Sequence, residues 1–127
     1  SIASWWNLLT IILDGARTPM GGLLGSLSAA TAPALASTAI ASALARSGIG
    51  ATEVDEVFMG CVLPAGLKQC PARQAAIGAG IPKSAGAVTV NKACGSGMQA
   101  AGLRECFLSG AQSFRQFDQS FGRDLNR

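Results

Sequence analysis

The sequence predicts an α/β protein with a mixed or parallel sheet and a β-α-β-α-β-α order of elements. The pattern of elements supports this fold class, and the composition supports a folded core. Short apolar runs, several of them β-branched, alternate with longer alanine-rich stretches of helical periodicity. The alternation favours right-handed crossovers between parallel strands. The chain has 127 residues, 49% of them hydrophobic and 13% charged, so it can form a core.

The first expected strand is the continuous apolar run from Leu8 to Leu13. Such a run is typical of a strand that is buried on both faces in a parallel sheet. Asp14 and Gly15 end it, and proline and glycine then mark a long loop through Gly25. This loop has neither a GxGxxG nor a GK[ST] pattern, so a structural role is favoured over phosphate binding.

The first helix is expected over residues 33–47. Thr31 can cap it, Pro33 suits its first turn and Gly48 can end it. Its apolar residues recur every three or four positions and predict one buried face: Leu35, Ala36, Ala39, Ile40, Ala43 and Leu44.

A second strand is expected over residues 54–62, with Cys61 in the core. A loop follows, and Pro71 begins a shorter alanine-rich helix that ends at Gly78 or Gly80. Within this helix, Arg73 is interpreted as a solvated or interface charge.

The third strand includes Val88, Thr89 and Val90 and leads directly into a helix, with Cys94 at the junction. The N–H groups at a helix start lack partners within the helix, and the helix dipole there favours the thiolate form of a cysteine. The same N–H groups can bind the oxygen that becomes negative when a thioester carbonyl is attacked. Two interpretations stay open from the spacing alone. Cys94 is either a nucleophile or a small buried apolar residue.

The last predicted helix places Ala100, Leu103 and Phe107 on one face, with Cys106 beside that face in the core, and Gly110 can end it. The composition then changes. Residues 111–127 are polar, with phenylalanines at helical spacing (Phe114, Phe117 and Phe121), and fit either a short amphipathic helix or a frayed tail.

Charge and cysteine usage argue against several classes of protein. The net charge is only +3 and the basic residues are scattered, so no nucleic-acid partner is expected. The four cysteines form no CxxC pair and the chain has no histidine, so no metal site is expected. Free thiols indicate a reducing compartment. No apolar run is long enough to cross a membrane and no targeting segment is visible. A cytoplasmic location is therefore expected, with mitochondria or peroxisomes as the alternatives.

Two segments carry a family resemblance. Residues 12–28 (ILDGARTPMGGLLGSLS) and residues 54–101, which contain NKACGSGM, closely resemble the amino-terminal part of thiolases, and within them the acetyl-CoA acetyltransferases. The resemblance runs from about residue 9 to residue 110. It divides the chain into a partial thiolase N-terminal domain, residues 1–110, and a divergent tail, residues 111–127. Lys68 and Cys70 are unlike the usual residues at their positions.

The resemblance implies a reaction and a site. Cys94 in NKACGSGM would be the residue that takes up the acyl group from a CoA thioester. The reaction would condense two acetyl-CoA molecules to acetoacetyl-CoA, or run in reverse as thiolysis, with no metal or redox cofactor. CoA is then a carrier for the substrate, and the complete enzyme would be a homo-oligomer.

The resemblance also implies what these residues lack. In thiolases a histidine in a Gly-His-Pro motif and a second cysteine come from the second half of the enzyme. This chain has no histidine. We therefore expect that it does not turn over by itself and is marginally stable. The alternative is a non-catalytic, truncated product that acts at most as a binding or oligomerisation module.

Overall fold

The structure is a computed structural model that describes residues 11–109, with side chains as far as Leu103. Three α-helices, a short 3-10 helix and two strands follow one another in this part of the chain: α1 (Ala32–Ser47), η3 (Ala51–Glu53), β1 (Glu56–Gly60), α2 (Pro71–Gly78), β2 (Gly86–Val90) and α3 (Ser96–Ser109).

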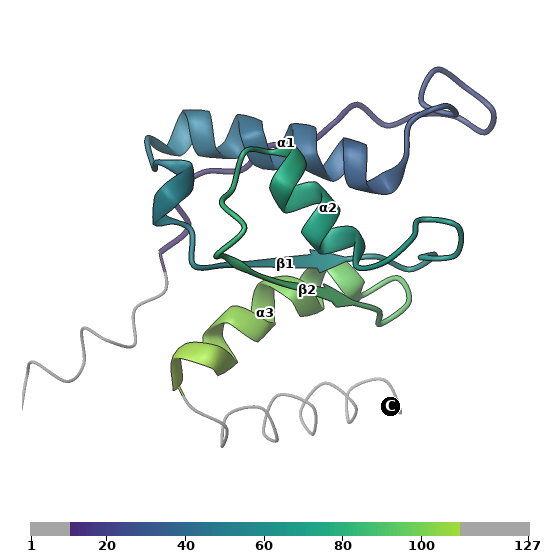
Figure 1. Cartoon of the computed structure of the whole chain (residues 1–127). Helices are drawn as coiled ribbons and strands as arrows, with labels where there is room; N and C mark the ends of the chain where they lie inside the picture. The colour runs from purple at the N-terminus through teal and green to yellow at the C-terminus, as the bar shows by residue number, and fades with distance from the viewer. Residues whose placement is uncertain (1–10, 110–127) are drawn as a thin grey trace, which may run out of the picture.

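The two strands form a parallel pair in which Val57 lies opposite Ala87 and Met59 lies opposite Thr89. The Cys61 N–H donates to the Val90 carbonyl at 2.9 Å and so extends the pairing beyond β1. Helix α2 covers one face of the pair and α3 the opposite face, while α1 lies over α2 (Figure 1). The predicted α/β class and the parallel pairing are confirmed.

Helix α1 begins and ends where local sequence signals predict. The Thr31 hydroxyl accepts a hydrogen bond from the Ala34 N–H at 3.4 Å, and Gly48 ends the helix with φ of 72°. Glycine adopts this left-handed conformation at little steric cost. Ile40 and Leu44, from the predicted apolar face, pack against the core.

The core of the described residues is small and built mainly from short side chains. Ala72, Ala75 and Ala76 on α2 are at most 1% exposed, which lets that helix lie close to the strands. The prediction that Cys61 is a core residue is confirmed, since it is 7% exposed. No large side chain in residues 11–103 is fully buried, whereas several large apolar ones are mostly exposed: Ile12, Leu13, Met20, Leu23, Leu24, Leu63 and Met98.

The predicted strand from Leu8 to Leu13 is wrong over the part that the structure describes. Residues 11–13 form no strand, and Ile12 is 87% exposed. An apolar run becomes a buried strand only when other elements cover both of its faces. Within residues 11–109, no strand pairs with this segment.

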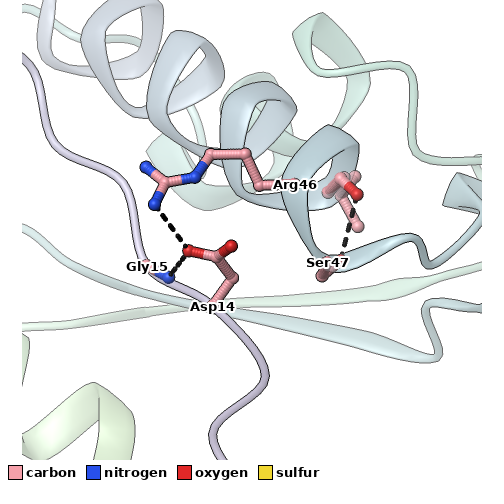
Figure 2. Close-up of polar contacts among 5 residues, drawn as sticks. Asp14, Gly15, Arg46 and Ser47 are labelled. Atoms are coloured by element: carbon pink, nitrogen blue, oxygen red, sulfur yellow. Dashed lines mark hydrogen bonds and ion pairs between the residues drawn. The ribbon is translucent and has the colours of Figure 1, made fainter.

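A surface ion pair joins this segment to the end of α1. Arg46 lies 3.1 Å from the Asp14 carboxylate, which also accepts a hydrogen bond from the Gly15 N–H (Figure 2). The Ser47 hydroxyl donates to the Leu44 carbonyl at 3.0 Å in the last turn of the same helix. Arg46 is largely exposed, so the ion pair contributes little stability.

Arg73 is an interface charge, which is one of the two roles that the sequence left open for it. Its guanidinium donates to the carbonyls of Ala85 and Lys83, and so joins α2 to the turn that leads into β2. A guanidinium can reach both carbonyls because its donors form a planar fork. Helix α2 ends at Gly78, which is one of the two ends predicted from the sequence.

Several sequence predictions lie outside the described residues. These are the surroundings of the Phe107 and Cys106 side chains, the role of Gly110 and the conformation of residues 111–127. Among the helices that are described, none is long and apolar enough to span a membrane.

The two arginines allow a matched test of the Arg73 contact. Replacing Arg73 with Ala leaves two carbonyls without their donor, so we expect a loss of about 2 kcal/mol in the free energy of unfolding. Arg46→Ala removes only an exposed ion pair and should cost less than about 1 kcal/mol. Urea titration, with limited proteolysis as the readout of unfolding, measures both values. Equal midpoints for the two variants would contradict the bridging role of Arg73.

The small core predicts a marginally stable chain. We expect the 127-residue protein to bind a hydrophobic dye in buffer and to melt over a broad temperature range, because large apolar side chains stay exposed. Dye fluorescence and circular dichroism measure this. A sharp, cooperative melt of a soluble monomer is the result that would speak against it.

Candidate functional site

Cys94 lies in the turn that joins β2 to α3, at the carboxyl end of the strand pair. It comes four residues after the end of β2 and two residues before the first residue of α3. Its side chain is exposed and is a free thiol. The structure thus places Cys94 just before the helix, as predicted, and the interpretation of a buried apolar residue is wrong. Ligands in open parallel sheets bind at this edge.

The turn is closed by its own backbone. The Gly95 N–H donates to the Lys92 carbonyl at 3.0 Å, and the Ser96 N–H donates to the Ala93 carbonyl at 3.1 Å. Ala93 has φ of 45°, a left-handed conformation that costs a residue with a side chain about 1–2 kcal/mol. Other contacts must therefore stabilise Ala93 in this conformation.

Ser96 supplies one of these contacts. It is a buried polar side chain, 3% exposed, at the first position of α3. Its hydroxyl accepts a hydrogen bond from the Lys92 N–H at 2.8 Å and donates to the Ala93 carbonyl at 2.7 Å. The sequence pattern indicated Ser96 only as part of a glycine-rich helix start, although serine at a helix start is a common capping residue.

Asn91 supplies a second contact, which was not predicted from the sequence. The side-chain oxygen accepts a hydrogen bond from the Ala93 N–H at 3.1 Å, and the side-chain nitrogen donates to the Val62 carbonyl at 3.0 Å. Asparagine is typical of turns in which the side chain binds the backbone two residues later. That preference is a signal through which Asn91 could have been found.

The start of α3 lies directly against the end of β1. A Cβ atom on Gly60 would be 2.5 Å from the carbonyl carbon of Ser96 and 2.6 Å from the nitrogen of Gly97. The absence of a side chain at Gly60 therefore permits this close approach. The end of β1 thus fixes how deep the start of α3 lies beside the strands.

Two N–H groups in the first turn of α3 make no hydrogen bond to any residue in the described range. They belong to Gly97 and Met98, whereas the Gln99 N–H donates to the Gly95 carbonyl at 2.9 Å. Free N–H groups at a helix start can stabilise a negative oxygen. The sequence predicted free N–H groups at this helix start only in general terms.

The other described cysteines lie in different environments. Cys61 is buried, whereas Cys70 is exposed at the start of α2, where its carbonyl accepts hydrogen bonds from the N–H groups of Arg73 and Gln74. Its sulfur lies 3.8 Å from the Thr89 hydroxyl oxygen. Among the side chains of residues 11–103, no three or more cysteines, aspartates and glutamates gather closely enough to hold a metal ion.

The fold and the cysteine turn together define a class of protein. The family model described as "Thiolase, N-terminal domain" matches residues 10–105. The chain therefore belongs to the thiolase family.

Within the thiolase family, several proteins similar to this chain are acetyl-CoA acetyltransferases. Acetyl-CoA acetyltransferase 2 of Arabidopsis thaliana is 58% identical over 89 residues, 70% of this chain and 22% of that protein. The cytosolic acetyl-CoA acetyltransferase ERG10 of Gibberella zeae is 55% identical and the mitochondrial acetyl-CoA acetyltransferase of Danio rerio 51% identical, each over 89 residues. These matches cover 70% of this chain and 22% and 21% of the two relatives. The chain thus spans about a fifth of the length of these relatives.

A solved structure gives the same result. The crystal structure of the Acat5 thiolase from Ascaris suum in complex with coenzyme A has a TM-score of 0.72 to this chain and is 36% identical. The match covers 73% of this chain and 24% of that protein. The described fold is thus that of part of a thiolase.

The Gly60 contact yields a test of how the turn is held. Gly60→Ala places a Cβ atom against the backbone of α3, which has no side chain that can move away, so we expect a loss of about 1–3 kcal/mol in the free energy of unfolding. Gly22→Ala is the control, because nothing lies within 4 Å of the added atom. Urea midpoints report both values. A Gly60 variant as stable as the control would show that β1 and α3 are not in close contact.

Proposed function

We propose that Cys94 is the acyl-accepting nucleophile of a thiolase-type acyl transfer between CoA thioesters. The observation that carries the proposal is the exposed Cys94 thiol in a hydrogen-bonded turn, within the segment that the thiolase family model matches. The similarity to acetyl-CoA acetyltransferases supports acetyl-CoA as the acyl donor. The similarity to the Ascaris suum thiolase, which was solved in complex with coenzyme A, supports a CoA thioester as substrate.

The reaction has two stages. In the first, the Cys94 thiolate attacks the thioester carbonyl of acetyl-CoA, the carbon–sulfur bond to CoA breaks, and CoA leaves as a thiolate that takes up a proton. In the second, another acetyl-CoA gives up an α-proton to a base, and its carbanion attacks the acetyl group on Cys94. The carbon–sulfur bond to Cys94 then breaks, which gives acetoacetyl-CoA and frees the thiolate. A covalent intermediate divides a difficult exchange into two easier steps. Thiolysis is the same sequence in reverse.

The chain's own residues contribute to the first stage. The turn presents the sulfur to solvent, and the N–H groups of Gly97 and Met98 are available in the first turn of α3. Hydrogen-bond donors that are already in place stabilise the negative oxygen of the tetrahedral intermediate without reorganising. No metal or redox cofactor is required, because the steps involve only proton and acyl transfer.

Turnover needs a base that activates the thiol in the first stage and a group that removes the α-proton in the second. By the resemblance to thiolases these would be a histidine and a second cysteine from the second half of the enzyme, and this chain has no histidine. Acid–base assistance contributes about 10²–10⁴-fold to such steps. We therefore propose that these residues accept an acetyl group slowly and do not turn over. The complete enzyme is proposed to be a homo-oligomer. The proposed location is the cytoplasm, with mitochondria or peroxisomes as alternatives, and relatives carry both cytosolic and mitochondrial names.

A second candidate function is a non-catalytic binding or oligomerisation module. The exposed large apolar side chains of the described residues favour it, because a partner protein could cover them. The two candidates differ in one observable. A binding module needs no acetyl group on Cys94.

Incubation with acetyl-CoA and peptide mass mapping tests the proposal. We expect one acetyl group on Cys94 after long incubation, and none after Cys94→Ala. Cys70 is also an exposed free thiol but lies at the start of a different helix, so it is the matched control. Cys70→Ala should leave the acetylation of Cys94 unchanged. Absence of the adduct from Cys94, or equal acetylation of Cys70, would contradict the proposal and favour the binding module.

A further inference from the structure

We propose that Asn91 is a positioning residue for Cys94. Its side-chain amide joins the end of β1 to the cysteine turn and holds Ala93 in the left-handed conformation from which Cys94 attacks the acyl donor. This inference rests on the proposed acyl transfer through Cys94 and assigns to Asn91 a role that acts through Ala93.

The geometry supports the role through two hydrogen bonds made by one side chain. The Asn91 oxygen accepts from the N–H of Ala93, the residue directly before Cys94, at 3.1 Å. The Asn91 nitrogen donates at 3.0 Å to the carbonyl of Val62, which lies two residues beyond the end of β1. The turn is therefore tied to a second segment of the chain and not only to its own backbone.

The Asn91 hydrogen bonds stabilise an unfavourable backbone conformation at Ala93. A left-handed backbone is unfavourable for alanine, and Ala93 has φ of 45°. The Asn91 bond satisfies the Ala93 N–H in that conformation, while the Ser96 hydroxyl satisfies the Ala93 carbonyl. Residue 93 sets the direction of the next residue, so these bonds together determine where the Cys94 sulfur lies relative to the first turn of α3.

Because Asn91 is exposed, its loss should affect the placement of Cys94 more than the stability of the fold. Asn91 is exposed, and its two hydrogen bonds are open to solvent. Removal of an exposed side chain of this kind leaves no buried polar atom without a partner. The fold should therefore persist in the variant, whereas the alignment of sulfur, carbonyl and N–H groups that acyl transfer requires should be lost.

The test compares two reactions of the same thiol in the full 127-residue chain. Acetyl transfer from acetyl-CoA requires that alignment, whereas alkylation by iodoacetamide requires only an accessible thiolate. For Asn91→Ala we expect acetylation of Cys94 to slow at least about 10-fold, because small displacements of reacting groups are costly. We expect alkylation of Cys94 to change by less than about threefold, because the thiolate remains accessible. Alkylation of buried Cys61 should stay slow, which reports that the fold is intact.

Two further variants sharpen the result. Gln69→Ala removes another exposed side-chain amide, one that makes no hydrogen bond to residues 11–103, and should change neither reaction. In the double variant with Asn91→Ala and Ala93→Gly, glycine adopts the left-handed conformation without strain, so part of the lost acetylation should return.

The contrary outcomes are distinct. Unchanged acetylation in Asn91→Ala, a parallel loss of alkylation at Cys94, rapid labelling of Cys61 or no recovery in the double variant would each overturn the positioning role. A parent chain that takes up no acetyl group on Cys94 would instead overturn the proposed function itself, and the role of Asn91 with it.

Discussion

The site depends on the close contact between the end of β1 and the start of α3. The backbone of Ser96 and Gly97 lies so near Gly60 that a methyl group at residue 60 would overlap it. This contact fixes one end of the turn that carries Cys94, while the pairing of β1 with β2 fixes the other end. The turn between them is short, so few conformations connect the two fixed ends. The buried Ser96 hydroxyl and the exposed Asn91 amide then stabilise the observed conformation.

Features that depend on neighbouring residues were predictable from the sequence, and those that depend on distant contacts were not. The ends of α1 follow from Thr31 and Gly48, and the start of α2 from Pro71. The position of Cys94 before a helix also follows from local pattern. The strand expected over residues 8–13 is absent from its described part, residues 11–13, because an apolar run does not specify which element covers it. The partners of Arg73 were not predictable because they are backbone carbonyls ten or more residues away.

The described residues contain some of the groups that the proposed reaction needs. The described residues provide an exposed thiol, a stabilised turn and free N–H groups in the first helical turn, which suit nucleophilic attack on a thioester. They provide no histidine that could act as a base. The described residues bury no large side chain fully and leave several large apolar ones exposed. The burial of apolar surface is therefore expected to contribute little to the stability of the fold. The cysteine turn is thus held by contacts with β1, in a fold that we expect to be marginally stable.

Residue-resolved hydrogen exchange by NMR tests the central claim, that the chain's own contacts preform the cysteine turn. The Lys92 and Ala93 amides donate to the Ser96 hydroxyl and the Asn91 oxygen, respectively. If the turn is preformed, both should exchange at least about 10-fold more slowly than in an unstructured peptide, because exchange then requires local opening. Exchange at the unstructured rate for both amides would show that the chain's own contacts do not preform the turn, and would contradict the account.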